Sequence, residues 1–256
     1  MDPHKFTTIA HGSHRHLNPV DPDALEQAVA RAGLRPGERA IDVGCGKAAL
    51  LIRLAETRGI LGTGVDLNPA FLAAARAEAE RSGVADRLTL IEGDASALDL
   101  PEAGFDLGIC IGASHALGDH VRTLRWLVRR VRPGGHLLIG EGYWKRPPDP
   151  EYLERLGATA DEMTTHEGNI ATGAAEGLKE RGAWVSRDQD WDRYEDLYAE
   201  TVERYGAAHP EDPDAPAMLE RIRRWRETYL RWGRDTLGFG LYLYRRRQGA
   251  PSRSER

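Results

Sequence analysis

Short apolar segments alternate with helical segments between residues 40 and 140, and this alternation restricts the fold more than any other feature of the chain. Apolar residues recur at helical spacing in three stretches, 48–58, 68–81 and 120–131. Strands that alternate with helices form βαβ crossovers, so the sequence predicts an α/β fold with a mostly parallel sheet and helices on both faces. The predicted strands of this core are 40–43, 61–67, 88–92, 105–111 and 136–140.

The flanking segments predict additional helices and two further strands. Residues 1–20 are polar and rich in histidine, which favours an ordered arm or loop, and Asp21-Pro22-Asp23 is typical of a helix start. The remaining pattern predicts helices at 151–156, 165–181, 191–205 and 217–232, a strand at 184–186 and a last strand at 237–245. We therefore expect one domain, made of an N-terminal arm and helix (1–38), a cofactor-binding core (39–142), a substrate-side insertion with cap helices (143–236), the last strand (237–247) and a flexible tail (248–256).

The composition favours a packed protein and argues against several classes of partner. The 256 residues are 41% hydrophobic and 29% charged, with a net charge of -5, which argues against a broad nucleic-acid-binding face. No window approaches the roughly 18 apolar residues of a membrane-spanning helix, and the first residues lack the apolar stretch of a signal peptide. Cys45 and Cys110 lie far apart and fit a reducing compartment, so we expect a cytoplasmic protein that does not bind membranes.

A glycine-rich turn follows the first predicted strand, in the run Ile41-Asp42-Val43-Gly44-Cys45-Gly46-Lys47. Glycine lets the backbone approach a ligand that a Cβ atom would block. Asp66 ends the second strand, where its carboxylate could bind ribose hydroxyls or, alternatively, cap the next helix. Asp94 follows the third strand, and Ile111 and Gly112 lie at the end of the fourth. Because ligands of open α/β sheets bind beyond the carboxyl ends of the strands, we expect these residues to converge.

The ordered set of motifs resembles the class I S-adenosylmethionine-dependent methyltransferases over about residues 20–142. The matching motifs are Asp42-Val43-Gly44-Cys45-Gly46, Gly64-Val65-Asp66, Glu92-Gly93-Asp94-Ala95, Phe105-Asp106 and Arg132-Pro133-Gly134-Gly135. The resemblance implies a doubly wound, Rossmann-like sheet of seven strands whose last strand is antiparallel. It also implies S-adenosylmethionine as the methyl donor and S-adenosylhomocysteine as the product.

The resemblance further implies roles for individual residues at the predicted edge of the sheet. The turn that contains Gly44, Cys45 and Gly46 would face the methionine part of the cofactor, in a motif that Asp42 opens. Asp66 would bind the ribose. The remaining implied cofactor contacts are Asp94 at the adenine amino group, Leu67 and Ala95 on either side of the adenine, and Ile111 and Gly112 on the same edge.

One position departs from the family pattern. Ala48 stands where the family often has another glycine, and we expect this change to be tolerated because alanine is small and favours helices. A nicotinamide dinucleotide site, which uses a similar turn, would require a third glycine at position 49, where the chain has alanine. The sequence therefore argues against a dinucleotide-binding protein.

Methyl transfer from a sulfonium requires the protein to align the nucleophile, exclude water and, for some acceptors, remove a proton. His115 follows the fourth strand and could act as a general base or serve only as a polar loop residue. Glu141 follows the fifth strand and could orient an amine, accept a proton or pair with an arginine. Tyr143 and Trp144 could form an aromatic wall for a cationic substrate or pack beneath the insertion. His115, Glu141 and Tyr143 are the candidate catalytic residues.

Two further patterns are open to a functional interpretation. His11, His14 and His16 match no zinc-binding spacing, so we expect no metal site and interpret the arm as a lid over the cofactor or substrate, or as surface. Aromatic residues recur at three- or four-residue steps in 191–205 and 217–232, which is typical of helix packing. Part of that stripe could line a substrate cavity.

The predicted function is methyl transfer to a small-molecule acceptor, with a nitrogen or oxygen nucleophile preferred. An RNA or protein methyltransferase is one alternative, although the acidic balance and the lack of an appended nucleic-acid module argue against RNA. A non-catalytic S-adenosylmethionine-binding sensor or partner protein is another. Methyl turnover distinguishes an enzyme from such a sensor.

Overall fold

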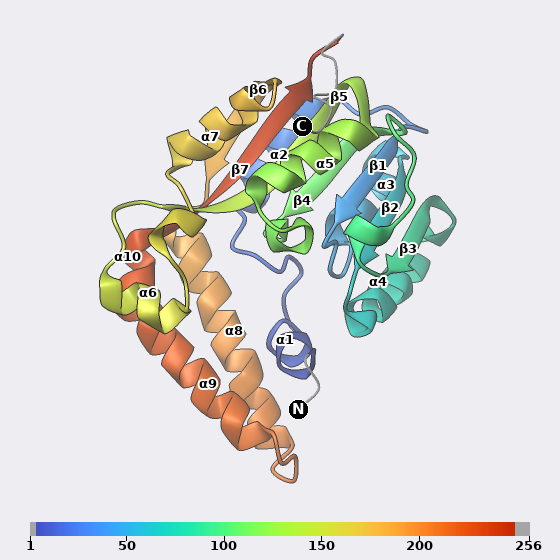
Figure 1. Ribbon diagram of the computed structural model, residues 1–256. Coiled ribbons are helices and arrows are strands. Elements are labelled where there is room, and N and C mark those ends of the chain that lie inside the picture. The colour runs from blue at the N-terminus through green and yellow to red at the C-terminus, as the bar shows by residue number, and fades with distance from the viewer. Residues whose placement is uncertain (1–3, 249–256) are drawn as a thin grey trace.

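A seven-stranded sheet in the order β3-β2-β1-β4-β5-β7-β6 forms the centre of the computed structural model, which describes residues 4–248 (Figure 1). Strands β1 to β5 are parallel, and β7 lies antiparallel between β5 and β6. The predicted Rossmann-like sheet with an antiparallel last strand is thus confirmed. Its strands are β1 (Arg39–Val43), β2 (Leu61–Asp66), β3 (Leu88–Glu92), β4 (Phe105–Ile111), β5 (Val131–Trp144), β6 (Leu178–Val185) and β7 (Leu237–Arg246).

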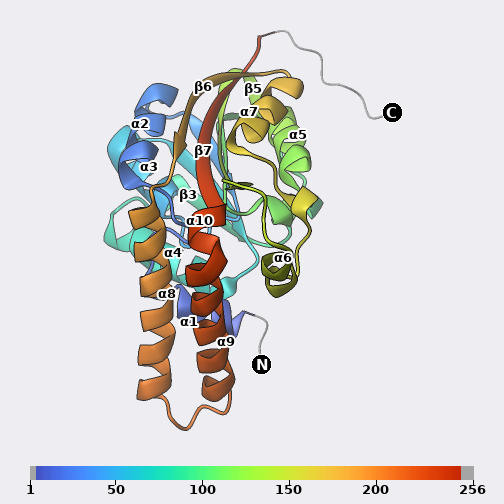
Figure 2. The same ribbon diagram turned by 90° about the vertical axis from the view of Figure 1, so that its left-hand side faces the viewer.

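Helices cover both faces of the sheet, as the alternating pattern predicts (Figures 1 and 2). Adjacent residues of β5 show this two-sided burial, because Leu138 packs into the apolar core of one face and Ile139 into that of the other. The first face carries α2 (Pro22–Ala32), α3 (Ala49–Arg58) and α4 (Pro69–Arg81), and the second carries α5 (His120–Arg130) and α7 (His166–Ala175).

The predicted helix starts at residues 21 and 68 are confirmed by their capping contacts. The side chain of Asp21 accepts a hydrogen bond from the amide of Asp23. The side chain of Asn68 accepts from the amides of Ala70 and Phe71. Such acceptors satisfy amide groups that the first turn of a helix leaves without partners.

The N-terminal arm differs from the prediction because it contains a helix, α1 (Lys5–Ala10). Phe6 and Ala10 of this helix are buried in a small apolar cluster with residues of the cap, such as Val202 and Met218. The apolar side of α1 is too short to show a helical pattern by itself. Its stability comes from tertiary packing, as is usual for a short helix.

The helix predicted at 165–181 is wrong beyond Ala175, and the sixth strand is longer than predicted. Gly177 adopts a left-handed φ of +77° that ends α7, and residues 178–185 then form β6. This strand lies at the edge of the sheet, where charged side chains reach water. Because residues 179–181 are all charged, the sequence shows no apolar alternation that would predict a strand there. The segment predicted as an insertion thus contributes a strand to the sheet.

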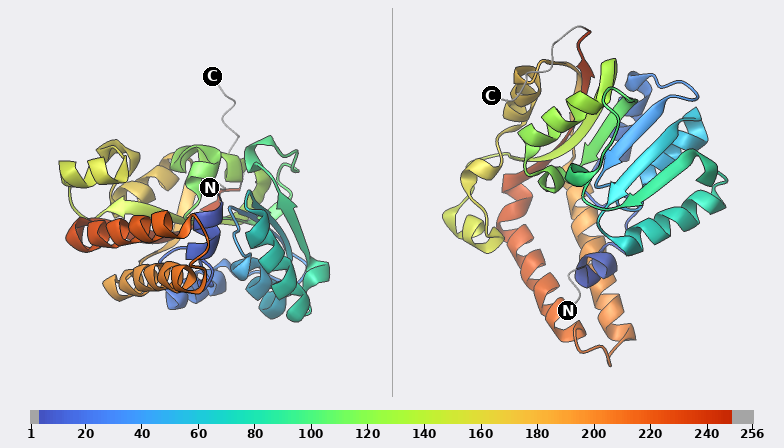
Figure 3. Two further views of the ribbon diagram at one scale, coloured as in Figure 1. Left: turned by 90° about the horizontal axis from the view of Figure 1, so that it is seen from below. Right: turned by 45° about the vertical axis from the view of Figure 1, so that its right-hand side comes forward.

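The other residues of the predicted insertion form a helical cap at the carboxyl edge of the sheet. α8 (Asp188–Ala208) and α9 (Ala215–Thr228) form a long hairpin that extends past this edge, with α1 beside it (Figures 2 and 3). The rings of Trp191 and Tyr229 stack at its base with centroids 6.2 Å apart, so the predicted packing role of the aromatic stripe is confirmed there. The short elements are α6 (Pro150–Leu156), α10 (Arg234–Thr236), the π-helix η5 (Tyr229–Gly233) and the 3₁₀ turns η1 (Ala85–Arg87), η2 (Ala95–Ala97), η3 (Ser114–Leu117) and η4 (Ala160–Glu162).

Within residues 4–248, no helix is both long enough and apolar enough to cross a membrane. The flexible tail predicted at 248–256 lies, except for Gln248, outside the described residues.

Candidate functional site

Main-chain hydrogen bonds join the carboxyl ends of β1, β2 and β3 and bring the predicted site residues together. The amides of Gly44 and Cys45 both donate to the carbonyl of Val65, at 2.9 and 3.1 Å. The amide of Gly93 donates to the carbonyl of Asp66 at 3.1 Å. The glycine turn and the ends of the next two strands therefore form one continuous edge, the place where open α/β sheets bind ligands.

The glycine turn adopts a left-handed backbone that requires its glycines. The φ angle is +69° at Gly44 and +53° at Gly46. A Cβ atom at Gly44 would lie 2.3 Å from the Cβ of Ala113, and one at Gly46 would lie 2.5 Å from Cδ1 of Leu17. Ala48 also has a positive φ, +52°, and precedes α3, so the prediction that it begins the helix is wrong. An alanine in this conformation carries a backbone strain of roughly 1–2 kcal/mol, which explains why glycine suits the position.

Asp66 acts as an acceptor for the glycine turn rather than as a helix cap. Its Oδ2 accepts a hydrogen bond from the amide of Gly46, and its Oδ1 accepts from the amide of Asn68, both at 2.8 Å. The cap of α4 is Asn68 itself, so the helix-cap alternative for Asp66 is wrong. A carboxylate has about four acceptor positions, and two remain for a ligand. The neighbouring Leu67 is 56% exposed.

Asp94 and Ala95 lie where β3 ends. Asp94 is exposed, and its Oδ1 accepts a hydrogen bond from the amide of Ser96 at 2.8 Å. This contact with Ser96 lowers the pKa of Asp94, so the carboxylate is charged at neutral pH. Ala95 is buried. The pair thus presents one charged acceptor on a short, apolar 3₁₀ turn.

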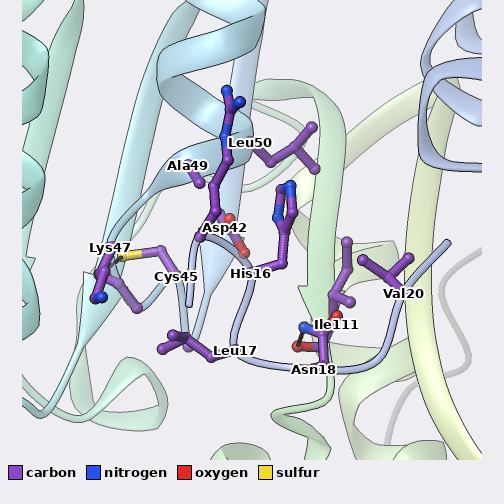
Figure 4. Close-up of a pocket in the computed structure, with 13 residues that line it drawn as sticks. His16, Leu17, Asn18, Val20, Asp42, Cys45, Lys47, Ala49, Leu50 and Ile111 are labelled. Carbon is purple, nitrogen blue, oxygen red and sulfur yellow. Dashed lines mark hydrogen bonds between the residues drawn. The ribbon is translucent and has the colours of Figure 1, made fainter. Parts of the chain in front are cut away.

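A small cavity of about 50 Å³ lies between the glycine turn and residues 15–18 (Figure 4). Asp42 lines it from β1 and is only 6% exposed, yet its side chain forms no hydrogen bond or ion pair with the described residues. Burial, followed by the charge of Asp66, raises the pKa of Asp42 to about 8. Ile111 lines the same cavity, and its carbonyl accepts a hydrogen bond from Nδ2 of Asn18 at 3.3 Å. Gly112, the next residue, has a φ of +71°.

The segment at 5–20, here called the N-terminal strap, is held onto the glycine turn by Lys47. The ammonium of Lys47 donates to the carbonyls of His11, Gly12 and His14, at 2.7, 2.8 and 2.9 Å. Sequence reasoning missed both this role of Lys47 and the cavity-lining residues of the strap. The position of this lysine, directly after the glycine turn, was visible in the sequence. Its three partners were not predictable, because every residue has a main-chain carbonyl.

The histidines of the strap pack against the hairpin. The Nε2 atom of His11 lies 2.9 Å from the hydroxyl of Tyr194, and that of His14 lies 3.0 Å from the carbonyl of the same residue. His16 instead lines the cavity. Burial lowers the pKa of His11 and of His16 to about 4, so both rings are neutral at pH 7. Residues 4–248 hold no group of three or more metal-binding side chains.

The three candidate catalytic residues lie in different environments. His115 is exposed on η3, and its ring forms no hydrogen bond, ion pair or ring contact within residues 4–248. Oε2 of Glu141 lies 3.2 Å from Nδ1 of His120, with both side chains mostly buried. Tyr143 is buried, its ring 5.4 Å from that of His166, and burial raises the pKa of its hydroxyl. Of the three, only His115 presents a free titratable group to solvent.

Trp144 packs beneath the insertion, which was one of the two interpretations of this residue. Its Nε1 donates to the carbonyl of Ala160 at 2.8 Å, and its ring contacts that of Tyr152 edge-on. With its ring buried and its donor satisfied, Trp144 contributes to packing rather than to an open aromatic wall.

Comparison with known proteins gives concordant matches. A family model described as a methyltransferase domain matches residues 41–139. A solved S-adenosylmethionine-dependent methyltransferase from Geobacter sulfurreducens, in complex with S-adenosylhomocysteine, is 32% identical with a TM-score of 0.88, covering 95% of this chain and 98% of that one. A second such complex, from Thiobacillus denitrificans, is 30% identical with a TM-score of 0.88, covering 96% and 100%.

A relative of stated substrate is also similar over most of the chain. The 27-O-demethylrifamycin SV methyltransferase of Amycolatopsis mediterranei is 28% identical over 79% of this chain and 80% of its own length. The similarity therefore extends well beyond residues 41–139.

Proposed function

Because the chain belongs to the class I S-adenosylmethionine-dependent methyltransferases and is an enzyme of that family, we propose that its methyl acceptor is a small molecule with a nitrogen or oxygen nucleophile. The cofactor is S-adenosylmethionine, and the product is S-adenosylhomocysteine.

The described edge of the sheet fits this cofactor. Gly44 and Gly46 line the cavity proposed for the methionine part, and the two remaining acceptor positions of Asp66 suit ribose hydroxyls. The exposed Leu67 offers an apolar surface to a base. The remaining proposed cofactor contacts are Asp42, Cys45, Asp94, Ala95, Ile111 and Gly112, all at or next to the ends of β1, β3 and β4.

The position of the strap beside the glycine turn carries the proposal of a small acceptor. Residues 15–18 of the strap line the cavity together with the glycine turn, and Lys47 fixes the strap there (Figure 4). A folded RNA or protein surface needs an open approach to the reacting atoms, whereas a small molecule can be enclosed and shielded from water. The rifamycin relative, which by its name methylates a small molecule, supports the same class.

The bound cofactor supplies a methyl group that a positive sulfur already activates, so the chain's own residues have limited tasks. They must hold the acceptor in line with that methyl group, exclude water and receive a proton when the acceptor carries one. We assign proton acceptance to His115, whose ring is exposed and without a partner within residues 4–248. Glu141 and Tyr143 are proposed to shape the acceptor side from the end of β5, with Glu141 held beside His120.

Calorimetric titration with S-adenosylmethionine, S-adenosylhomocysteine and NAD tests the cofactor site, followed by an acceptor screen with small amines and phenols. We expect saturable binding of the first two ligands only, and a roughly 10- to 100-fold weaker affinity in Asp66→Ala, since charged hydrogen bonds contribute about 1.5–3 kcal/mol. Asp86→Ala, which changes an exposed aspartate on η1, is the matched control. Methylation of RNA or protein but of no small molecule would overturn the proposed acceptor class.

A further inference from the structure

Two side chains that line the cavity beside the glycine turn have hydrogen-bond acceptors without partners. Asp42 of β1 forms no hydrogen bond or ion pair within residues 4–248. Asn18 of the strap donates from Nδ2 to the carbonyl of Ile111, whereas its Oδ1 is buried and has no hydrogen-bond partner among the described residues (Figure 4). Because buried polar atoms normally have a partner, these acceptors indicate a donor that the chain itself does not supply.

The cationic side chains that line the same cavity differ in how far they are already occupied. The ammonium of Lys47 donates to three carbonyls of the strap, so each of its three hydrogens has a partner. Arg15 of the strap is exposed and forms no hydrogen bond or ion pair with the described residues. The neighbouring His16 is neutral at pH 7, because burial lowers its pKa to about 4. Arg15 therefore remains available to an anionic group at this cavity.

The amino-acid end of the cofactor matches this distribution of charge. S-adenosylmethionine and S-adenosylhomocysteine share this end, which carries an ammonium with three donors and a carboxylate, the one anionic group of either ligand. The cavity of about 50 Å³ suits one end of the cofactor rather than the whole, because sites for drug-sized ligands measure roughly 300 Å³ or more. Asp66 and Leu67, the proposed contacts of the ribose and the base, do not line the cavity.

We propose that the strap recognises the amino-acid end of the cofactor, with Arg15 bound to the carboxylate and Oδ1 of Asn18, together with Asp42, bound to the ammonium. This inference rests on the proposed placement of the cofactor at the glycine turn. The guanidinium of arginine suits a carboxylate because it forms two parallel hydrogen bonds with it. An ammonium beside Asp42 also stabilises the charged form of that carboxyl group, whose pKa burial raises to about 8.

These contacts make the bound cofactor a link between the strap and the sheet, because Arg15 and Asn18 belong to the strap and Asp42 belongs to β1. Binding of the amino-acid end therefore stabilises the closed strap, and the closed strap strengthens binding by the same factor. A nucleoside without this end, such as 5′-methylthioadenosine, reaches only the ribose and base contacts. It leaves the strap with the contacts that it already has, chiefly those to Lys47.

Calorimetric titration of the whole enzyme with S-adenosylhomocysteine and with 5′-methylthioadenosine separates the amino-acid end from the rest of the ligand. We expect Arg15→Gln to weaken binding of S-adenosylhomocysteine roughly 10- to 100-fold, and Asn18→Leu, which removes the buried acceptor at similar size, roughly fivefold to tenfold. Neither variant should change the affinity for 5′-methylthioadenosine by more than about twofold. Arg223→Gln, which changes an exposed arginine on α9, is the matched control and should bind both ligands as the wild-type enzyme does.

Hydrogen exchange of the strap amides in the wild-type enzyme tests the link between ligand and strap directly. At saturation, S-adenosylhomocysteine should slow this exchange about tenfold and 5′-methylthioadenosine less than about twofold. Equal protection of the strap by the two ligands would overturn the inference and leave the cofactor site in place. So would an Arg15→Gln enzyme that binds both ligands normally or loses affinity equally for both. Failure of the folded enzyme to bind either ligand would instead overturn the proposed cofactor site, and the inference with it.

Discussion

At the scale of single residues, the burial of Asp42 makes the stability of the protein depend on pH. Its pKa rises from about 3.9 in an unfolded chain to about 8 in the folded protein, so the folded state binds the extra proton. Its contribution to the free energy of unfolding is therefore present at low pH and is lost as pH rises from about 4 through 8. Asparagine, a neutral isostere of aspartate, does not ionise, so its contribution to the free energy of unfolding does not fall as pH rises.

Asp42→Asn should accordingly raise the melting temperature of the ligand-free enzyme, by several degrees at pH 8 and by little at pH 5. Thermal unfolding of both proteins at the two pH values measures the effect. A gain in stability that is equal at pH 5 and pH 8 would show that Asp42 is not protonated in the folded protein.

His115 is the residue whose replacement should affect the reaction without affecting cofactor binding. We expect His115→Gln to lower kcat by roughly 10²-fold or more, the usual contribution of a positioned base, while the Kd for S-adenosylmethionine changes less than about threefold. His209→Gln, on the distant tip of the hairpin, is the matched control. A kcat within a factor of about two of the wild-type value would remove His115 from the proposed mechanism.

The residues that could be predicted from the sequence are those whose role follows from local geometry. Gly44 and Asp66 lie at strand ends, and strand order alone brings strand ends together. Lys47 could not be predicted, because its partners are main-chain carbonyls that any residue would supply. The positive φ of Ala48 could not be predicted either, because alanine favours helices and its backbone strain arises only in the folded turn.

At the scale of elements, the N-terminal strap depends on one ammonium group. Lys47→Met keeps the length of the side chain but leaves the carbonyls of His11, Gly12 and His14 without their donor, a loss of roughly 2 kcal/mol for local opening. We expect hydrogen exchange in the strap to quicken about 10- to 30-fold and trypsin to cleave faster after the exposed Arg15. The measurement is exchange mass spectrometry with limited proteolysis.

Lys179→Met is the control for that experiment, because Lys179 is exposed on the edge strand β6. In Lys179→Met, the amide hydrogens of the strap should exchange at the wild-type rate. A strap that stays equally protected in Lys47→Met would mean that its contacts with the hairpin suffice, chiefly the packing of the strap histidines on Tyr194.

The elements themselves were predictable where hydrophobic pattern and capping agree, and they were not where tertiary contacts override the pattern. β5 (Val131–Trp144) extends well beyond the predicted 136–140, whereas strands β1 to β4 and α4 follow their signals closely. β6 does not, because an edge strand tolerates charged residues such as those at 179–181 and so lacks a buried alternation. α1 is missed for the opposite reason, since its burial against the hairpin is created only by the fold.

At the scale of the whole molecule, the seven-stranded sheet with its antiparallel last strand was expected from the resemblance, whereas the direction of the hairpin was not. The base of the hairpin belongs to the main core, since Trp191 and Tyr229 pack in the same apolar cluster as Leu138 and Phe239. Its far end has a separate small core, to which α1 contributes Phe6. The strap therefore links the two cores by passing over the proposed cofactor site between them.

This linkage leads us to propose that residues 4–248 unfold as one unit, with the predicted arm, core, insertion and last strand all included. Loss of the hairpin would expose the aromatic base and the apolar side of α1 together, so neither part gains by unfolding alone. We expect one calorimetric transition, and amide hydrogen exchange that shows α8, α9 and the sheet strands losing protection together across it. Loss of protection in α8 and α9 before the strands would instead show that the hairpin is an independent unit that opens without unfolding of the sheet.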